Sequence, residues 1–411
     1  MDLYEESLEL HAKNNGKLAV ISKVAVKNRH DLAIAYTPGV AEPCRKIEED
    51  KNLSFEYTCR GNMVAIVSDG TRVLGLGDIG PEAAMPVMEG KAVLFKTFGD
   101  VDAVPICIDA KDPDEFVNMV TRLQPSFAGI NLEDISSPKC YEIEDRLKEI
   151  CDIPVFHDDQ HGTAIAACSA VVGALRFVKK DLKDAKIIMH GYGAAGTAIA
   201  RLLLALGAGD VIITTRVGAV DSKYPRKMDK VQEYLQGVTN KHDEHGMLED
   251  VAKGADVLIG ASGPNLFTEE VIGNMNENPI VFALANPVPE ITYENALKFG
   301  AAVAGTGRSD TPNQVNNVTV FPGIFRGALD CRATAITEDM KVAAVYAISN
   351  LIADEDLKAD YVVPDAFDER VIPAVAAAVA KVAMETGVAR VKVDPKAVYE
   401  NTLKRVNLKN K

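Results

Sequence analysis

Short apolar runs alternate with amphipathic segments along much of the chain, beginning near residue 103. The runs have the length of buried strands, and the segments between them repeat apolar residues at helical spacing. We predict strands at residues 104–108, 127–132 and 153–156, with helices at 113–124 and 139–150 between them. Strands that alternate with helices form parallel sheets through right-handed crossovers. An earlier strand-like run, at 63–68, precedes loops rich in glycine and aspartate.

A second alternating series fills the later half of the chain. An apolar segment at 162–178 precedes it, and we interpret this segment as a buried helix and a hinge. The series comprises strands at 186–190, 211–215, 257–260, 280–284 and 301–304, a helix that ends near 206, and apolar helices near 337–353 and 369–386. The predicted fold is α/β, with a Rossmann-type dinucleotide-binding domain and an N-terminal α/β domain that has a parallel sheet.

This pattern also predicts domain boundaries. We expect an N-terminal domain at 1–160 for substrate and metal, a dinucleotide-binding domain at 161–390, and a C-terminal tail at 391–411. The active cleft is expected between the two domains.

Composition narrows the possible functions and locations. A net charge of −14 argues against nucleic-acid binding, which needs a positive surface. The acidic N-terminus has no apolar core typical of a signal peptide, and the most apolar stretches, 164–175 and 371–380, are shorter than a membrane span. Seven scattered cysteines without a C-x-x-C pair are typical of reduced thiols. We therefore expect a cytoplasmic protein that is not bound to a membrane.

A glycine motif opens the second series. Gly191-Tyr192-Gly193-Ala194-Ala195-Gly196 follows an apolar strand and begins a helix rich in alanine and leucine. In this context the pattern predicts a dinucleotide site rather than a simple turn. The first glycine permits the turn, the second allows the pyrophosphate to approach, and the third allows the helix to pack on the strand. A second loop, Gly260-Ala261-Ser262-Gly263, is either near the nicotinamide ribose or a plain turn.

The choice between NAD and NADP depends on the end of the next strand. NAD sites usually place an acid there, whereas this strand ends in Thr214-Thr215-Arg216. Thr215 tolerates a 2′-phosphate, and Arg216 or the basic stretch 223–230 can pair with it. The pattern favours NADP, with relaxed selectivity as the alternative.

Acidic residues follow two predicted parallel strands. Glu133-Asp134 ends one and His157-Asp158-Asp159 ends the next, so these carboxylates should converge at one sheet edge. Such a group needs a cation, and ligands that are all oxygen suit Mg²⁺ or Mn²⁺. The alternative is that Asp134 and Asp159 are helix N-caps. His157 and His161 flank the group, and we assign them supporting or structural roles.

Further segments resemble the malic enzyme family in its short bacterial form. The resemblance is carried by the glycine motif, the acidic pairs, and five other segments: Ala35-Tyr36-Thr37-Pro38-Gly39-Val40, the loop from Ser68 to Gly80, Gly90-Lys91, Ala285 to Glu290, and Asn316 to Gly323. It extends in order from about residue 10 to residue 390.

The resemblance implies a role for each matched residue. Tyr36 would be the general acid and Lys91 the general base of an NAD(P)-dependent oxidative decarboxylation of L-malate to pyruvate. Glu133, Asp134 and Asp159 would hold the metal, with Asp158 near Lys91. Arg72 would bind a malate carboxylate, while Asn286 and Asn317 would contact the substrate and the nicotinamide. The dinucleotide itself would lie against Gly191, Gly193, Ala194, Ala195, Gly196, Thr215 and Asn286.

The proposed base must lose a proton, which sets a requirement on its pKa. A free lysine has a pKa of about 10.4, and we expect a nearby dication, Arg72 and burial to lower that of Lys91. Asp158 would oppose this shift but could orient the amine.

Two other functions remain as alternatives. The first is another metal-dependent hydroxy-acid or amino-acid dehydrogenase with the same dinucleotide-binding half, and the second is a nucleotide sensor or scaffold without catalysis. Taken singly, Tyr36, Lys91, Arg72 and the asparagines also suit packing, turn or surface roles. Apolar helices near the C-terminus lead us to expect a homodimer, in which Tyr36 and Lys91 belong to one subunit or to two.

Overall fold

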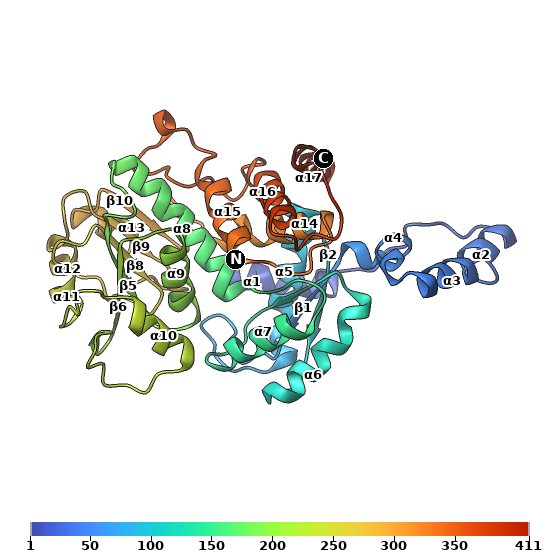
Figure 1. Cartoon of the computed structure of the whole chain (residues 1–411), viewed down its shortest axis with the longest axis horizontal. Helices are drawn as coiled ribbons and strands as arrows, with labels where there is room; N and C mark the ends of the chain where they lie inside the picture. The colour runs from blue at the N-terminus through green and yellow to red at the C-terminus, as the bar shows by residue number, and fades with distance from the viewer. Residues whose placement is uncertain (1, 410–411) are drawn as a thin grey trace.

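In the computed structural model, which describes residues 2–409 and side chains as far as 406, two β-sheets lie side by side (Figure 1). The first sheet has the order β2-β1-β3-β4, and its four strands are all parallel. They are β1 (Met63–Ser68), β2 (Asp102–Cys107), β3 (Gly129–Leu132) and β4 (Val155–His157).

Strand periodicity divides the β1 side chains between two cores. Val64 and Ile66 face a core that includes α5, whereas Ala65 and Val67 face α6 and α7. All four of these side chains are completely buried, as expected for a parallel sheet covered on both faces. The helices are α5 (Pro81–Gly99), α6 (Pro113–Leu123) and α7 (Lys139–Ile150).

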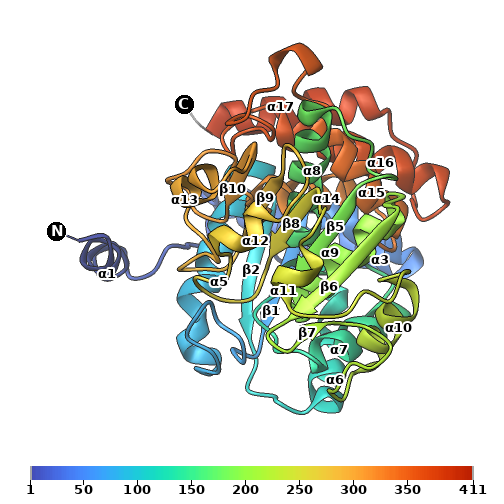
Figure 2. The same cartoon turned by 90° about the vertical axis from the view of Figure 1, so that its left-hand side faces the viewer.

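The second sheet has the order β10-β9-β8-β5-β6-β7, and only the short β7 is antiparallel. This is the doubly wound order of a Rossmann-type sheet, with β5 and β8 adjacent at the switch point. Its strands are β5 (Lys186–His190), β6 (Asp210–Thr215), β7 (Gly218–Ala219), β8 (Val257–Gly260), β9 (Ile280–Ala283) and β10 (Val303–Thr306). The helices around it are α9 (Ala194–Ala205), α10 (Lys230–Val238), α11 (Leu248–Val251), α12 (Glu269–Gly273) and α13 (Tyr293–Lys298), of which Figure 2 shows α11 and α12 in front.

A long helix, α8 (Asp158–Val178), connects the two sheets and packs along α9. It begins four residues earlier than the predicted helix at 162–178, so Asp158 and Asp159 lie in its first turn. Among the described residues this is the one helix long and apolar enough to cross a membrane, and most of it is buried inside the protein. That burial agrees with its predicted role as a core helix.

The last helices return to the first sheet. Phe321 and Phe325 of α14 pack on Phe95 of α5, with ring centroids 4.6 and 5.4 Å apart. The C-terminal helices are α14 (Phe321–Asp330), α15 (Glu338–Ser349), α16 (Val371–Glu385) and α17 (Pro395–Lys409). The predicted division at 1–160, 161–390 and 391–411 stays a prediction, because these helices contact both parts.

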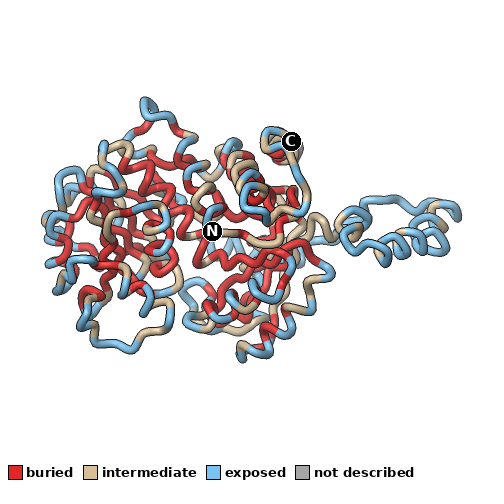
Figure 3. The backbone as a smooth tube through the Cα atoms, in the orientation of Figure 1, coloured by how far each residue is buried: buried red, intermediate tan, exposed pale blue. Residues whose placement is uncertain are grey.

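An arm extends from the N-terminal domain (Figure 1). It contains α2 (Arg29–Ala35), α3 (Ala41–Glu49) and α4 (Ser54–Tyr57), and Figure 3 shows it exposed along almost its whole length. None of these three helices has a buried residue. The first helix, α1 (Leu3–Asn14), lies apart from the arm, beside the cleft between the sheets.

Candidate active site

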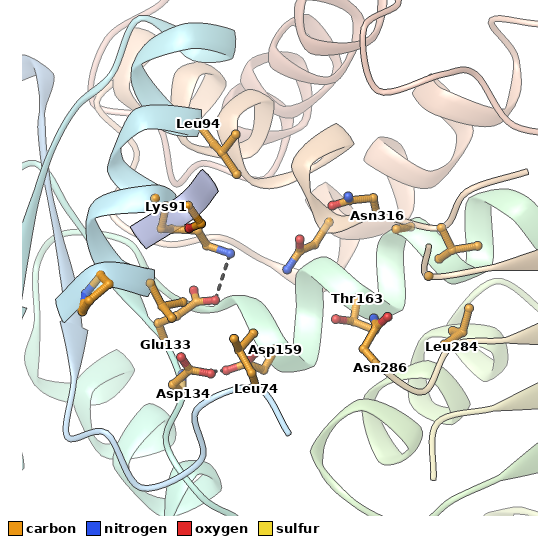
Figure 4. Close-up of a pocket in the computed structure, with 18 of the residues that line it drawn as sticks. Leu74, Lys91, Leu94, Glu133, Asp134, Asp159, Thr163, Leu284, Asn286 and Asn316 are labelled. Carbon is orange, nitrogen blue, oxygen red and sulfur yellow. Dashed lines mark hydrogen bonds and ion pairs between the residues drawn. The ribbon is translucent and has the colours of Figure 1, made fainter. Parts of the chain in front are cut away.

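A cavity of about 640 Å³ lies between the two sheets (Figure 4). Its walls come from α5, the end of β3, the first turns of α8, the segment after β9, and the segment before α14. The residues of functional interest that line it are Lys91, Glu133, Asp134, Asp159, Thr163, Asn286, Asn316 and Asn317. The structure thus brings the predicted lysine, the three predicted metal ligands and both asparagines to one space.

Lys91 is the buried cation of this cavity, with 7 % of its surface exposed. Its Nζ forms ion pairs with Glu133 Oε1, at 2.9 Å, and with Asp158, and it lies 4.2 Å from the centroid of the Phe321 ring. Burial lowers the lysine pKa, but the charges of Asp158 and Glu133 outweigh it and raise the pKa above its ordinary value. Two carboxylates thus face the amine, and the lowering of its pKa expected beside a bound dication stays a prediction.

The carboxylates after β3 and β4 converge because these strands are adjacent and parallel. Asp159 Oδ2 accepts a hydrogen bond of 2.8 Å from the backbone N–H of Asp134. Burial, followed by the charges of Asp159 and Glu133, raises the pKa of Asp134 to about 9. Burial also raises the pKa of Glu133. A group of carboxylates that resists ionisation in this way is expected where a cation belongs.

The residues that line the cavity include the oxygen ligands that a hard dication requires. Asp134 Oδ2 is buried without a hydrogen-bond partner, and all three candidate ligands are carboxylates. Among the described residues, no group of three His, Cys, Asp or Glu side chains is already arranged to hold a metal ion. Lys91 pairs with Glu133, and the Asp134 backbone N–H donates to Asp159. The donor set nevertheless suits Mg²⁺ or Mn²⁺, which prefer oxygen ligands.

The N-cap alternative fails for both aspartates. Pro138 is the N-cap residue of α7, and no side chain caps that helix. Asp159 is inside the first turn of α8, whose N-cap residue is His157. Carboxylates in this first turn lie beside the positive end of the helix dipole, which favours acidic side chains there.

The predicted acid and the predicted carboxylate-binding arginine do not line the cavity. Tyr36 follows α2 on the arm and is 67 % exposed. Arg72 is exposed, and its backbone N–H donates to the Asp134 carbonyl at 3.0 Å. Its neighbour Leu74 lines the cavity instead. The roles assigned to Tyr36 and Arg72 stay predictions.

The glycine motif forms the loop between β5 and α9. A Cβ at Gly191 would lie 2.5 Å from the Ala261 carbonyl oxygen, whereas one at Gly193 would meet nothing within 4 Å. A Cβ at Gly196 would clash with the Gly191 carbonyl oxygen, so a glycine there allows the helix to pack closely on the strand. Gly193 thus leaves open backbone at the helix N-terminus, an arrangement that suits a pyrophosphate. Ala194 and Ala195 form the first turn of α9.

Residues of α1 and its following turn also line the cavity, and no sequence motif pointed to them. Ser7, His11 and Lys17 reach it because the Lys17 backbone N–H donates to Glu89 at 3.0 Å. His11 Nδ1 donates to the Ser7 carbonyl at 2.7 Å, which leaves Nε2 as a buried nitrogen without a partner. This contact between residues 72 positions apart is a tertiary one that local patterns do not reveal.

A Rossmann-type sheet that faces an acidic cavity with a buried lysine is typical of oxidoreductases that use a nicotinamide dinucleotide. Residues 15–148 match the family model "Malic enzyme, N-terminal domain", and residues 160–384 match "Malic enzyme, NAD binding domain". The chain belongs to the malic enzyme family.

Individual relatives agree with this assignment. The bifunctional malic/malolactic enzyme of Bacillus subtilis is 55% identical over 98% of both chains, and the NAD-dependent malic enzyme of Geobacillus stearothermophilus is 52% identical over 91% of this chain and 78% of its own length. The NADP-dependent malic enzyme of Escherichia coli is 46% identical over 91% of this chain and 51% of its own. A crystal structure of malic enzyme from Pyrococcus horikoshii superimposes with a TM-score of 0.96, 46% identity, and coverage of 100% of this chain and 97% of that one.

Proposed function

We propose that the protein oxidises L-malate with NAD(P) and decarboxylates the product to pyruvate. One observation carries this proposal: a buried lysine held by two carboxylates faces the carboxyl edge of a dinucleotide-binding sheet. Family membership supports the same reaction.

The experiment is malate-dependent reduction of the dinucleotide with the released CO₂ captured. We expect one CO₂ for each dinucleotide reduced. Dinucleotide reduction without CO₂ would favour another hydroxy-acid dehydrogenase, and dinucleotide binding without turnover would favour a sensor.

Three carboxylates are proposed to hold the metal. Glu133, Asp134 and Asp159 supply oxygens from two adjacent strand ends, and Mg²⁺ or Mn²⁺ suits such a set. When bound, the cation supplies Lewis-acid stabilisation of the negative charge that develops on the substrate.

Lys91 is proposed as the base that takes the proton of the malate C2 hydroxyl at Nζ. Its pKa must fall for this, and neutralising Glu133 removes one of the two carboxylate charges that raise it. Asp158 then keeps the amine oriented, and Asn317 donates to the same carboxylate. Asn286 lies on the opposite wall, where it can contact the substrate and the nicotinamide.

Tyr36 is proposed as the acid that protonates the carbon from which CO₂ leaves. The arm that carries Tyr36 extends away from both sheets of its own chain (Figure 1), and Tyr36 does not line the cavity around Lys91. In this arrangement Tyr36 does not reach a substrate bound at Lys91 of the same chain. The arm exposes Leu32, Ile34 and Val40 together with Tyr36, which is unfavourable for an isolated chain. We therefore propose a homodimer in which the arm of one subunit completes the site of the other.

Mixing two inactive variants tests this shared site. Tyr36→Phe and Lys91→Ala homodimers should each be impaired in pyruvate formation. A refolded mixture should regain up to about a quarter of wild-type activity, because half of its dimers are mixed and each mixed dimer has one intact site. A mixture no more active than its components would place both residues in one subunit or remove Tyr36 from the mechanism.

For the cofactor we propose NADP over NAD. Arg216 follows β6, and a Cβ at Gly263 would lie 3.0 Å from its Nη2, so the guanidinium reaches the loop after β8. Thr215 Oγ1 accepts from the Tyr224 hydroxyl at 3.1 Å, and no acid stands at this strand end. Comparing kcat/KM for the two cofactors tests the preference, and a large NAD preference would contradict it.

The seven cysteines form no disulfide. Together with the bacterial relatives, these free thiols support the proposal of a cytoplasmic enzyme.

A further inference from the structure

A buried carboxylate lies outside the main cavity, beside the corner where β4 is followed by α8 and its two aspartates. Glu144, on α7, has 3 % of its surface exposed and accepts four hydrogen bonds or ion pairs. Its donors are the backbone N–H of His157 at 3.2 Å, Gln160 Nε2 at 3.1 Å, His161 Nε2 at 3.0 Å and Lys148 Nζ at 2.7 Å. Three of these four donors belong to the five residues from His157 to His161.

These five residues divide between two environments. Asp158 pairs with Lys91, and Asp159 lines the main cavity. Residues 157, 160 and 161 instead contact Glu144. The corner between β4 and α8 is therefore held from behind by one side chain while its two aspartates face the site.

We propose that Glu144 is a positioning residue that fixes the β4–α8 corner and thereby sets the metal affinity of the site. The proposal rests on the proposed function only in that Asp159 is taken as a metal ligand. Groups that hydrogen-bond metal ligands alter metal affinity about ten- to a hundredfold when changed. Glu144 acts on the ligand Asp159 through its chain neighbours, so this range is the upper limit of the effect expected here.

The surroundings of Glu144 show why packing alone does not hold the corner. A second, small cavity of about 170 Å³ lies beside it, walled by Glu144, Gln160, His161, Arg201, Glu338 and Lys341. Hydrogen bonds, rather than close-packed side chains, therefore fix this side of the segment.

Lys341, from α15, secures the geometry of His161. Its ammonium donates to His161 Nδ1 at 3.2 Å and pairs with Glu338 at 2.7 Å. Since an ammonium can only donate, Nδ1 is the acceptor, and Nε2 carries the hydrogen directed at Glu144. Helices α7, α8 and α15 are thus connected through one carboxylate and one imidazole.

The test is direct titration of the purified protein with Mn²⁺, followed by electron paramagnetic resonance, without substrate or turnover. Glu144→Gln keeps the shape and removes the charge, and we expect Mn²⁺ to bind more weakly, by at most about ten- to a hundredfold. Dinucleotide affinity, measured by fluorescence, should be unchanged. Glu142→Gln is the matched control, because Glu142 is on the same helix and its side chain is 58% exposed.

A second variant covers the case in which Glu144→Gln does not fold. Gln160→Met removes one donor while leaving the carboxylate paired with Lys148, and it should weaken Mn²⁺ binding in the same direction by a smaller factor. Wild-type Mn²⁺ affinity in a folded Glu144→Gln protein, or in Gln160→Met if the first variant does not fold, overturns the proposal. Because the readout is metal binding, it is separate from whether malate is the substrate, which only the turnover assay decides.

Discussion

The cavity around Lys91 and the arm that carries Tyr36 are built in opposite ways. Lys91 is almost fully buried and pairs with two buried carboxylates, Glu133 and Asp158, whereas α2 and α3 have no buried residue. A region whose charged groups are paired and whose apolar side chains are buried within the chain needs no second subunit. A region that leaves its apolar side chains exposed requires another surface, so the two proposed catalytic groups depend on different levels of structure.

The largest effect should come from removing the buried amine. Lys91→Ala should lower kcat for malate oxidation by about 10²–10⁴-fold, the usual contribution of a positioned base. Malate-dependent NADPH formation measures this, with Lys111→Ala as the control, since Lys111 pairs with Asp78 on the surface. Near-normal turnover of the Lys91 variant would assign the base to another group.

A change to a proposed metal ligand should have the next largest effect. Asp159→Asn should weaken Mn²⁺ binding by about 10²-fold while leaving the dinucleotide affinity intact, because Gly193 and α9 are not involved. Excess chelator should likewise stop turnover of the wild type. Full activity in chelator would show that these carboxylates serve another purpose.

The smallest effect should come from the arm. Ile34→Asp places a charge on its exposed apolar surface and should raise the dimer dissociation constant by about tenfold or more, equivalent to about 1.4 kcal/mol. Sedimentation over a concentration series measures this. Ile150→Asp, at a site that is also about half exposed, is the matched control, and an equal response of both variants would argue against an interface at the arm.

The central fold could be predicted because its strands are short, apolar and bounded by glycine or acidic residues. The strands at 186–190 and 257–260 and the helix at 139–150 have the predicted limits. Parallel order then placed Glu133 and Asp159 at one edge, because strand direction alone determines that edge. The α/β class and the Rossmann-type sheet are confirmed.

The remaining features depend on contacts that no local pattern encodes. The raised pKa of Lys91 follows from its pairing with Asp158 and Glu133 across 67 and 42 positions of the chain. The return of α14 to α5 and the approach of His11 to the cavity are likewise long-range packing. The arm has no buried residue in α2 or α3, and the surface against which it would pack belongs to the proposed homodimer.

The proposed metal ligands come from two parts of the molecule, because one of them lies on helix α8. Its first turn carries Asp159, and its length packs along α9 of the dinucleotide-binding half, whereas Glu133 and Asp134 belong to the strand end of the other half. Any opening of the cleft that moves α8 with the dinucleotide-binding half would have to break the bonds between Glu144 and the start of α8 before Asp159 could separate from Glu133 and Asp134. Release of product and loosening of the ion would then be a single mechanical event.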